Sequence, residues 1–249
     1  MVIHPVNSPS HVDRNEPQDR LIVALDFPSA QHARAFLDKL DGTCRWLKIG
    51  MELYYAEGNA FVQELRSAGY EIFLDLKLHD IPNTVAAAVK SVAKSGASLL
   101  TIHAAGGAAM MAAAVKAVEE PGAPRLLAVT VLTSMDTEQL AGIGIEVCPA
   151  NQVLRLAQLA WEAGVRGMVC SAEEVAILRA ELGEKAELIV PGIRPLGSAV
   201  GDQKRIASPG EAIQSGASRL VVGRPITQAS NPKAAAEAIL EEIASISNN

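Results

Sequence analysis

The stretch "EIFLDLKLHDIPNTV", residues 71–85, shows in fifteen positions how this chain is organised. An apolar run, residues 72–74, leads directly into Asp75 and Lys77, and Pro82 then opens a helix-like segment. Continuous apolar residues are typical of a buried strand, and proline suits the first turn of a helix. The segment therefore predicts a strand followed by a helix, with charged residues at the strand's carboxyl end.

The same strand-then-helix pattern occurs eight times. The strands are expected at 21–26, 45–50, 71–77, 98–104, 126–133, 165–170, 187–193 and 219–223. The helices are expected near 29–40, 57–68, 82–95, 107–119, 151–163, 172–182, 208–215 and 232–246. The strand centres are continuously apolar rather than alternating, as in parallel strands covered on both faces. Eight such units predict an α/β fold, a single-domain (β/α)8 TIM barrel.

A doubly wound open sheet is the alternative fold. It usually carries a G-x-G-x-x-G turn after its first strand. The first turn here is "DFPSAQ", without those glycines, and "HAAGGAAM" at 103–110 lacks their spacing. The same lack of a fingerprint argues against NAD-linked oxidoreduction.

Composition limits the function classes. The chain has 249 residues and a net charge of −6, so a basic stripe that tracks nucleic acid is not expected. Cys44, Cys148 and Cys170 are scattered, which indicates reduced thiols in a cytoplasmic protein. No apolar run is long enough to span a membrane. Residues 1–18 are polar and are expected to form a flexible N-terminal arm, with the barrel over 19–249.

Polar residues follow the apolar runs at the carboxyl end of seven of the eight expected strands. They are Asp26, Lys48, Asp75, Lys77, His103, Thr133, Ser134, Arg194 and Arg224. In (β/α)8 barrels, chemistry is located at these carboxyl ends. Each residue alone also has a plain structural interpretation. Asp26 can be a turn or cap residue, Lys48 a solvated strand end, His103 a core histidine, and Thr133 and Ser134 turn formers.

The combination is more informative than its members. Asp26, Lys48, Asp75 and Lys77 come from three adjacent strands and are expected to converge as an alternating, charge-compensated Lys–Asp–Lys–Asp array. Asp75 and Lys77 are two residues apart, so on a regular strand both side chains face the same way. Asp80 comes after the strand has turned. It can cap the following helix or project towards a second subunit.

The late loops indicate an anion site. Residues 191–206 form a long glycine-punctuated segment, and "VVGRPI" follows at 221–226. Barrels often bind phosphate between these two loops. Gly223 permits close backbone approach, Arg224 can bind phosphate oxygens in a fork, and Gln203 can donate from the long loop.

These segments together resemble one family. "DLKLHDIPNT" at 75–84 is similar to the D-x-K-x-x-D-I-P-N-T motif of the orotidine 5'-phosphate decarboxylase family, in its bacterial branch. The resemblance extends over the chain from residue 20 onward. It includes "VALD" (23–26), "LKIG" (47–50), "TIHAAGG" (101–107), "VTVLTSM" (129–135), "PGIRP" (191–195), "GDQKRI" (201–206) and "VVGRPI" (221–226).

The resemblance implies decarboxylation of orotidine 5'-monophosphate to UMP, the last step of de novo pyrimidine synthesis, by a homodimer without metal or organic cofactor. It implies catalytic roles for Lys48, Asp75, Lys77 and Asp80, with Lys77 protonating C6. The implied substrate-binding residues are Asp26, Lys48, Asp75, Lys77, Asp80, Ile81, Thr84, His103, Thr133, Ser134, Pro191, Arg194, Gln203, Gly223 and Arg224. Of these, Asp80, Ile81 and Thr84 would reach the partner subunit's site.

Two rival functions stay open at this point. A phosphosugar aldolase or 3-keto-sugar-phosphate decarboxylase of the same superfamily shares the D-x-K-x-x-D core but resembles metal-dependent chemistry. The "IPNT" and "GIRP" segments argue against it. A catalytically silent nucleotide-binding barrel would have lost a member of the charged array, and none is missing.

Overall fold

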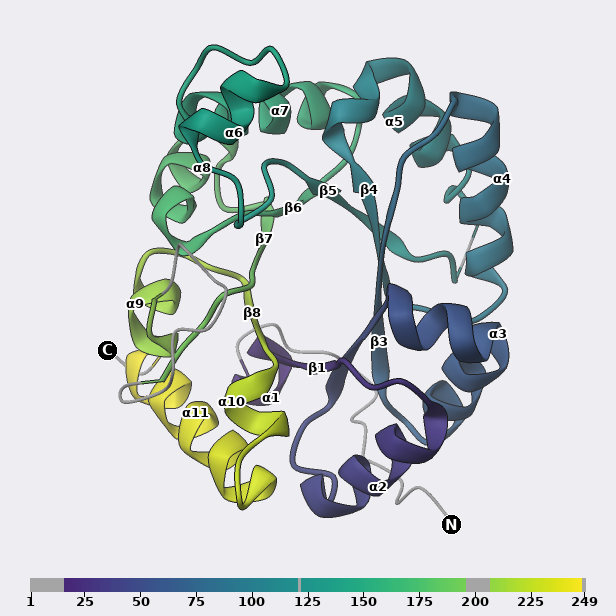
Figure 1. Cartoon of the computed structure of the whole chain (residues 1–249), viewed down its shortest axis with the longest axis vertical. Helices are drawn as coiled ribbons and strands as arrows, with labels where there is room; N and C mark the ends of the chain where they lie inside the picture. The colour runs from purple at the N-terminus through teal and green to yellow at the C-terminus, as the bar shows by residue number, and fades with distance from the viewer. Residues whose placement is uncertain (1–15, 121, 196–206, 248–249) are drawn as a thin grey trace.

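Eight parallel strands close into a barrel, which confirms the predicted (β/α)8 fold (Figure 1). The computed structural model describes residues 16–120, 122–195 and 207–247. Each strand pairs with the next along the chain, and β8 pairs with β1 through Leu21 opposite Leu220. The strands are β1 (Leu21–Leu25), β2 (Trp46–Gly50), β3 (Glu71–Leu78), β4 (Leu99–His103), β5 (Arg125–Val129), β6 (Gly167–Val169), β7 (Glu187–Val190) and β8 (Arg219–Val222).

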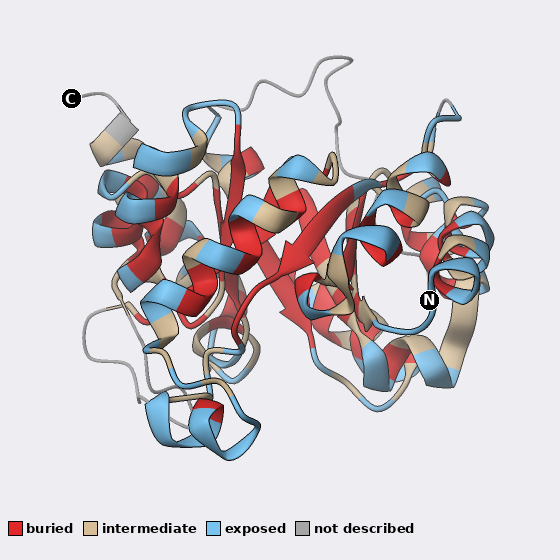
Figure 2. Ribbon diagram, turned by 90° about the horizontal axis from the view of Figure 1, so that it is seen from above, coloured by how far each residue is buried: buried red, intermediate tan, exposed pale blue. Residues whose placement is uncertain are grey.

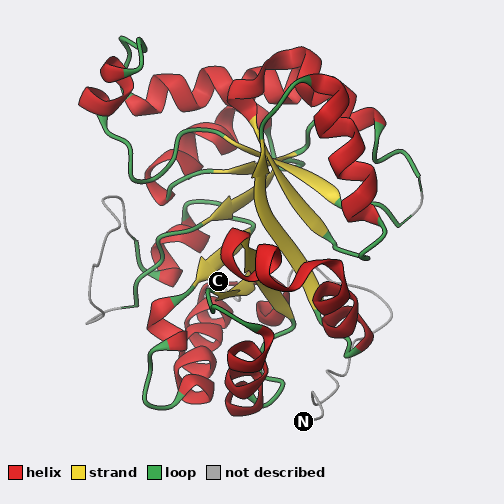
Figure 3. Cartoon of the chain, turned by 45° about the vertical axis from the view of Figure 1, so that its right-hand side comes forward, coloured by secondary structure: helices red, strands yellow, loops and turns green. Residues whose placement is uncertain are grey.

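Helices form a ring around the strands (Figure 3). The main ones are α2 (Ala30–Leu40), α3 (Met51–Ser67), α4 (Pro82–Ala93), α5 (Gly107–Lys116), α7 (Pro149–Glu162), α8 (Val175–Leu182), α9 (Pro209–Gln214) and α11 (Pro232–Ser247). Each corresponds to one predicted helix. Left-handed glycines follow several of them, for example Gly164 (φ 96°) after α7 and Gly216 (φ 103°) after α9. A residue without Cβ adopts this conformation at little cost, so these glycines end the helices.

Some elements differ from the prediction. Helix α3 begins at Met51, six residues before the expected start, and it contains a kink at Gly58 (φ 66°). The short helices α1 (Pro17–Arg20), α6 (Thr137–Gly142) and α10 (Arg224–Thr227), and the 3₁₀ turn η1 (Ala104–Gly106), were not predicted. The helix expected near 172–182 begins with a 3₁₀ turn, η2 (Ala172–Glu174), before α8. Segments of three to six residues are too short to show helical periodicity. The expected arm 1–18 lies outside the described residues except for its last positions, of which Pro17 and Gln18 belong to α1.

The apolar core has two parts, which explains why the strands are apolar without alternation and are buried along their length (the strands in Figure 2 are mostly in the colour of buried residues). One part lies between strands and helices. The other fills the barrel interior with Ile22, Ala24, Trp46, Phe73, Leu99, Leu127, Ile189 and Val221. Strand residues that face either way are therefore buried. In the described chain, no helix is both long and apolar enough to cross a bilayer.

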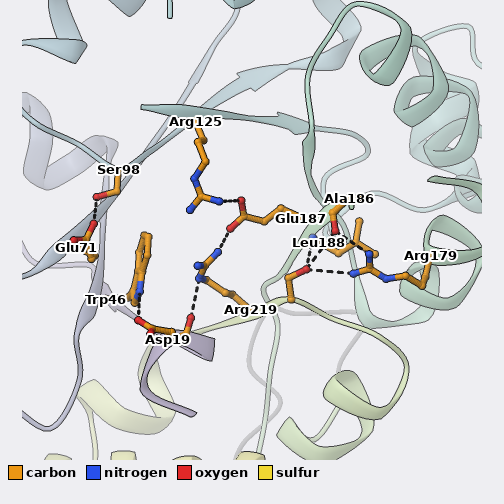
Figure 4. Close-up of polar contacts among 11 residues, drawn as sticks. Asp19, Trp46, Glu71, Ser98, Arg125, Arg179, Ala186, Glu187, Leu188 and Arg219 are labelled. Carbon is orange, nitrogen blue, oxygen red and sulfur yellow. Dashed lines mark hydrogen bonds and ion pairs between the residues drawn. The ribbon is translucent and has the colours of Figure 1, made fainter. Parts of the chain in front are cut away.

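Buried charges close the amino-terminal end of the barrel (Figure 4). Glu187 pairs with both Arg125 and Arg219, and Arg219 lies 4.4 Å from the centre of the Trp46 ring. Asp19 of α1 accepts hydrogen bonds from Trp46 Nε1 at 3.1 Å and from an Arg45 nitrogen at 2.6 Å. Because both signs of charge are paired, the network tolerates its burial. It also attaches α1 to the bottom of the barrel.

We expect Glu187→Gln to lower the free energy of unfolding by about 3 kcal/mol, because it removes a carboxylate that pairs with the buried Arg219. Glu64→Gln is the matched control. Its partner Arg34 has a side chain that is 31% exposed, so this change should cost less than about 1 kcal/mol. Urea unfolding of both variants measures the difference. Equal losses would contradict the importance of the buried network.

Candidate active site

A cavity of about 260 Å³ opens at the carboxyl ends of the strands. The charged and polar side chains that line it are those of Asp26, Lys48, Asp75, Lys77, Thr133, Arg194 and Arg224. They come from β2 and β3 and from the segments that follow β1, β5, β7 and β8. The barrel thus brings together residues that are almost 200 positions apart in the chain.

Four charged side chains form a continuous series in this cavity. Lys48 Nζ donates to Asp26 Oδ1 at 3.1 Å and lies 3.8 Å from Asp75 Oδ2. Lys77 Nζ donates to Asp75 Oδ1 at 2.8 Å. The order is Asp26, Lys48, Asp75, Lys77, so each inner charge has an opposite charge on both sides. The Asp26 side chain is 64% exposed, whereas those of Lys48, Asp75 and Lys77 are 11%, 15% and 27% exposed, so the two inner members of the series are the most sheltered.

The environment of Asp75 favours its carboxylate form. Burial by itself raises the pKa of Asp75. The attraction of Lys48 and Lys77, with hydrogen bonds from Lys77 and Thr101, outweighs burial and holds the pKa below its ordinary value. Asp75 is therefore ionised at neutral pH, between two ammonium groups.

The backbone at Lys77 is not that of a regular strand. Its φ angle is 50°, in the left-handed region that non-glycine residues rarely adopt. The register shifts here: Leu74 pairs with Leu100, but Leu78 pairs with Ile102. Such a conformation costs about 1–3 kcal/mol and is held by surrounding contacts. The expected convergence of Asp75 and Lys77 is present, but the expected regular strand is wrong at this point.

A second part of the cavity wall, here called the basic wall, carries Arg194 and Arg224. Pro191, Gly223 and Thr133 also line the cavity. Burial, and then the positive charge of Arg224, lower the pKa of the Arg194 guanidinium. Two cations that disfavour each other in this way would both be stabilised by an anion between them. A Cβ at Gly223 would lie 3.6 Å from Asp26 Oδ2, so the backbone of this loop is close to the charged series.

Other predicted site residues lie elsewhere. Asp80, Ile81 and Thr84 are exposed at the start of α4, and in the described chain they do not line the cavity. Asp80 Oδ1 accepts from the Ile81 backbone N–H at 2.6 Å. Ser134 is exposed next to Thr133. Gln203 lies outside the described residues.

His103 is half-buried and lies beside the cavity lining rather than in it. Its ring centre is 5.4 Å from that of His79. The pKa of His103 is lowered, first by burial and then by the charges of His79 and Lys77, although the negative charge of Asp75 acts to raise it. The imidazole is therefore neutral at pH 7.

Sequence reasoning missed the apolar lining of the cavity. The side chains of Phe73, Val129, Val131, Leu132, Val169, Cys170 and Val221 contribute to it. They are ordinary members of apolar strands and of the segments that extend them, so their residue types do not distinguish them from the rest of the apolar core. An apolar wall with a few convergent charges is typical of a small-molecule site.

Fold and cavity together define a (β/α)8 barrel with a charged small-molecule site at the carboxyl ends of its strands. The sequence profile described as "Orotidine 5'-phosphate decarboxylase / HUMPS family" matches residues 19–239. The chain belongs to this family, and the resemblance drawn from its motifs is confirmed.

Individual relatives agree with the family. The chain is 51% identical to "Orotidine 5'-phosphate decarboxylase" of Vibrio cholerae (strain ATCC 39541) over 232 residues, which cover 92% of this chain and 97% of the relative. It is 47% identical to the protein of the same name from Aliivibrio fischeri (strain MJ11), over 91% of this chain and 98% of the relative. By their names these relatives are carbon–carbon lyases.

Solved structures are similar as well. The "Crystal structure of Orotidine 5'-phosphate decarboxylase from Lactobacillus acidophilus" has a TM-score of 0.81 and 42% sequence identity, covering 90% of this chain and 99% of that one. A structure described as an uncharacterized conserved protein from Geobacillus kaustophilus has a TM-score of 0.79 and 39% identity, with the same coverage.

Proposed function

We propose that this chain decarboxylates orotidine 5'-monophosphate to UMP, the last step of de novo pyrimidine synthesis. The observation that carries the proposal is the continuous series Asp26–Lys48–Asp75–Lys77 in a cavity that Arg194 and Arg224 also line. Family membership and the names of the relatives support the substrate.

The reaction has to stabilise a localised charge. When the bond between C6 and the carboxylate carbon breaks, its electron pair stays on C6 in an sp² orbital that the ring cannot delocalise. Lys77 presents a fixed ammonium group at one end of the charged series, held by Asp75 at 2.8 Å. A preorganised cation in a water-poor site stabilises such a charge as it develops. Lys77 then transfers a proton from Nζ to C6, carbon dioxide leaves, and the amine regains a proton from water.

Asp75 and Lys48 support this step. The low pKa of Asp75 keeps its charge in place, so it fixes Lys77 and repels the substrate carboxylate. We assign the larger share of the acceleration to Lys77, because its interaction strengthens only as negative charge appears on C6. Lys48 lies between Asp26 and Asp75, and we propose that it links the ribose to the rest of the charged series.

The phosphate is assigned to the basic wall. Arg194 and Arg224 provide the charge, and Gly223 lets the backbone approach. Gln203 is proposed to complete this site. Thr133, Ser134, Pro191 and His103 are proposed to surround the pyrimidine and ribose. Binding energy from the remote phosphate can be used to hold the substrate against the charged series.

We also propose a homodimer in which Asp80, Ile81 and Thr84 reach the partner's site. The exposure of a large apolar residue, Ile81 at 67%, at the start of α4 supports an interface there. Tyr55 of α3, 74% exposed, is a second large hydrophobic side chain on the surface.

A cytoplasmic location is proposed from the three free cysteines, and cell fractionation tests it.

Lys77→Ala should lose turnover by about 10⁴-fold or more while keeping its fold, because it removes both the cation and the proton donor. Ultraviolet monitoring of orotidine 5'-monophosphate loss measures this, and circular dichroism checks the fold. Lys90→Ala, which changes an exposed lysine of α4, is the control and should keep wild-type activity. Wild-type activity of the Lys77 variant would remove the proton-donor assignment.

Assays with EDTA should show undiminished turnover, and dependence on a metal would favour the phosphosugar alternative.

Arg224→Ala should lower kcat/KM by about 10²-fold or more, since a charged phosphate clamp is lost. The control is Arg166→Ala, an exposed arginine at the opposite end of the barrel, which should change kcat/KM by less than about twofold. A value for the Arg224 variant within twofold of wild type would contradict the phosphate assignment.

The dimer proposal predicts complementation between two inactive variants. Lys77→Ala and Asp80→Ala should each be inactive alone. A refolded mixture contains heterodimers in which one site has both residues, so about a quarter of all sites should be active. If the mixture stays inactive although size-exclusion chromatography shows dimers, Asp80 does not act across the interface.

A further inference from the structure

Residues Asp75 to Lys77 of β3 have a single residue opposite them on the neighbouring strand β4. The pairs Leu74–Leu100 and Leu78–Ile102 flank the irregularity, so a step of four residues on β3 matches a step of two on β4. Thr101 is the residue in between. Lys77, with its left-handed backbone, therefore lies where the regular pairing of the two strands is interrupted.

The Thr101 side chain replaces part of that lost pairing. Its Oγ1 accepts a hydrogen bond from the Lys77 backbone N–H at 2.8 Å and donates one to Asp75 Oδ1 at 3.1 Å. The direction of each bond is settled by chemistry. A backbone N–H only donates and an ionised carboxylate only accepts, so the hydroxyl proton points to Asp75.

These bonds close a ring around Lys77. The backbone of Lys77 is held by Thr101, Thr101 is bonded to Asp75, and Asp75 Oδ1 accepts from Lys77 Nζ at 2.8 Å. Both ends of the lysine are thereby fixed relative to one carboxylate oxygen. Thr101 itself is fully buried, and it is not among the side chains that line the cavity. It can act on a bound substrate only through its two partners.

We propose that Thr101 is a positioning residue: its hydroxyl holds the left-handed backbone of Lys77 and the orientation of Asp75, and so places Lys77 Nζ for proton transfer. This rests on the function proposed above. A methyl group in place of the hydroxyl would leave the Lys77 N–H without its acceptor and Asp75 without one of its donors. The ammonium group would then sample positions away from the reacting carbon.

The test compares Thr101→Val, which keeps the branched shape, with Thr101→Ser, which keeps the hydroxyl. Thr101→Val should lower kcat by about 10- to 100-fold, as expected when a reacting group is misplaced, with KM changed by less than about threefold. Thr101→Ser should stay within about threefold of wild type in both constants. The control is Thr130→Val. Thr130 is also nearly buried, but its hydroxyl bonds to the Val169 carbonyl at 3.1 Å, away from the charged series.

A second readout separates positioning from general packing. The bond from Thr101 is one of the contacts that lower the pKa of Asp75, so its removal should raise that pKa. The acidic limb of the kcat–pH profile should move to higher pH in Thr101→Val, and should not move in Thr101→Ser or Thr130→Val. Carbon-13 NMR titration of the Asp75 carboxyl group checks the same shift without relying on turnover. If Thr101→Val does not fold, Thr101→Cys provides a variant of similar size with a weak hydrogen-bonding group.

The outcomes are distinct. Unchanged kcat in Thr101→Val, an unmoved Asp75 pKa, or equal losses in Thr101→Val and Thr130→Val would each overturn the positioning role. If wild-type protein does not turn over orotidine 5'-monophosphate, the proposed function fails. In that case an Asp75 pKa that rises in Thr101→Val still supports the inferred ring, and one that does not rise overturns it.

Discussion

Closure of the sheet is the constraint on which the other features depend. Pairing of β8 with β1 turns eight parallel strands into a ring, so all their carboxyl ends meet around one opening. Asp26 and Arg224 are far apart in the sequence, yet both line the same cavity because their strands are neighbours across this closure. An open sheet with the same strands would place them at opposite edges.

Charged side chains are buried in a paired network at one end of the barrel and partly accessible at the other. At the amino-terminal end, Glu187, Arg219 and Asp19 are buried in a network of paired groups, which is suited to closing the barrel. At the carboxyl end, opposite charges alternate but stay partly accessible beside a cavity. The first arrangement contributes stability. The second keeps ionised groups in place with room for a ligand between them and the basic wall.

Much of the site was predictable because one rule places it. Chemistry at the carboxyl ends of barrel strands picks out Asp26, Lys48, Asp75 and Lys77 from the sequence, and the structure places them in one series. The eight strands were predictable from continuous apolar runs. Helix α3 was predicted too short, near 57–68, because its first turns come before the kink at Gly58.

Other features had no signal in the sequence. The left-handed conformation of Lys77 depends on how two strands meet, and lysine has no preference for it. Thr101 lies in an apolar strand where a threonine is unremarkable, and only the register shift gives it a special neighbour. Contacts across an interface, proposed for Asp80, likewise depend on a surface that one chain's pattern does not define.

The irregularity of β3 has a consequence for protein engineering. Copying Asp75 and Lys77 onto a strand of another barrel would reproduce two side chains on an even pleat, without the turn in the backbone that aims the amine. A transplant of this chemistry needs three parts: the acid–base pair, two surplus residues in the host strand, and a hydroxyl-bearing residue on the adjacent strand to hold the distortion. The transferable unit is thus a pair of strands and not a linear motif.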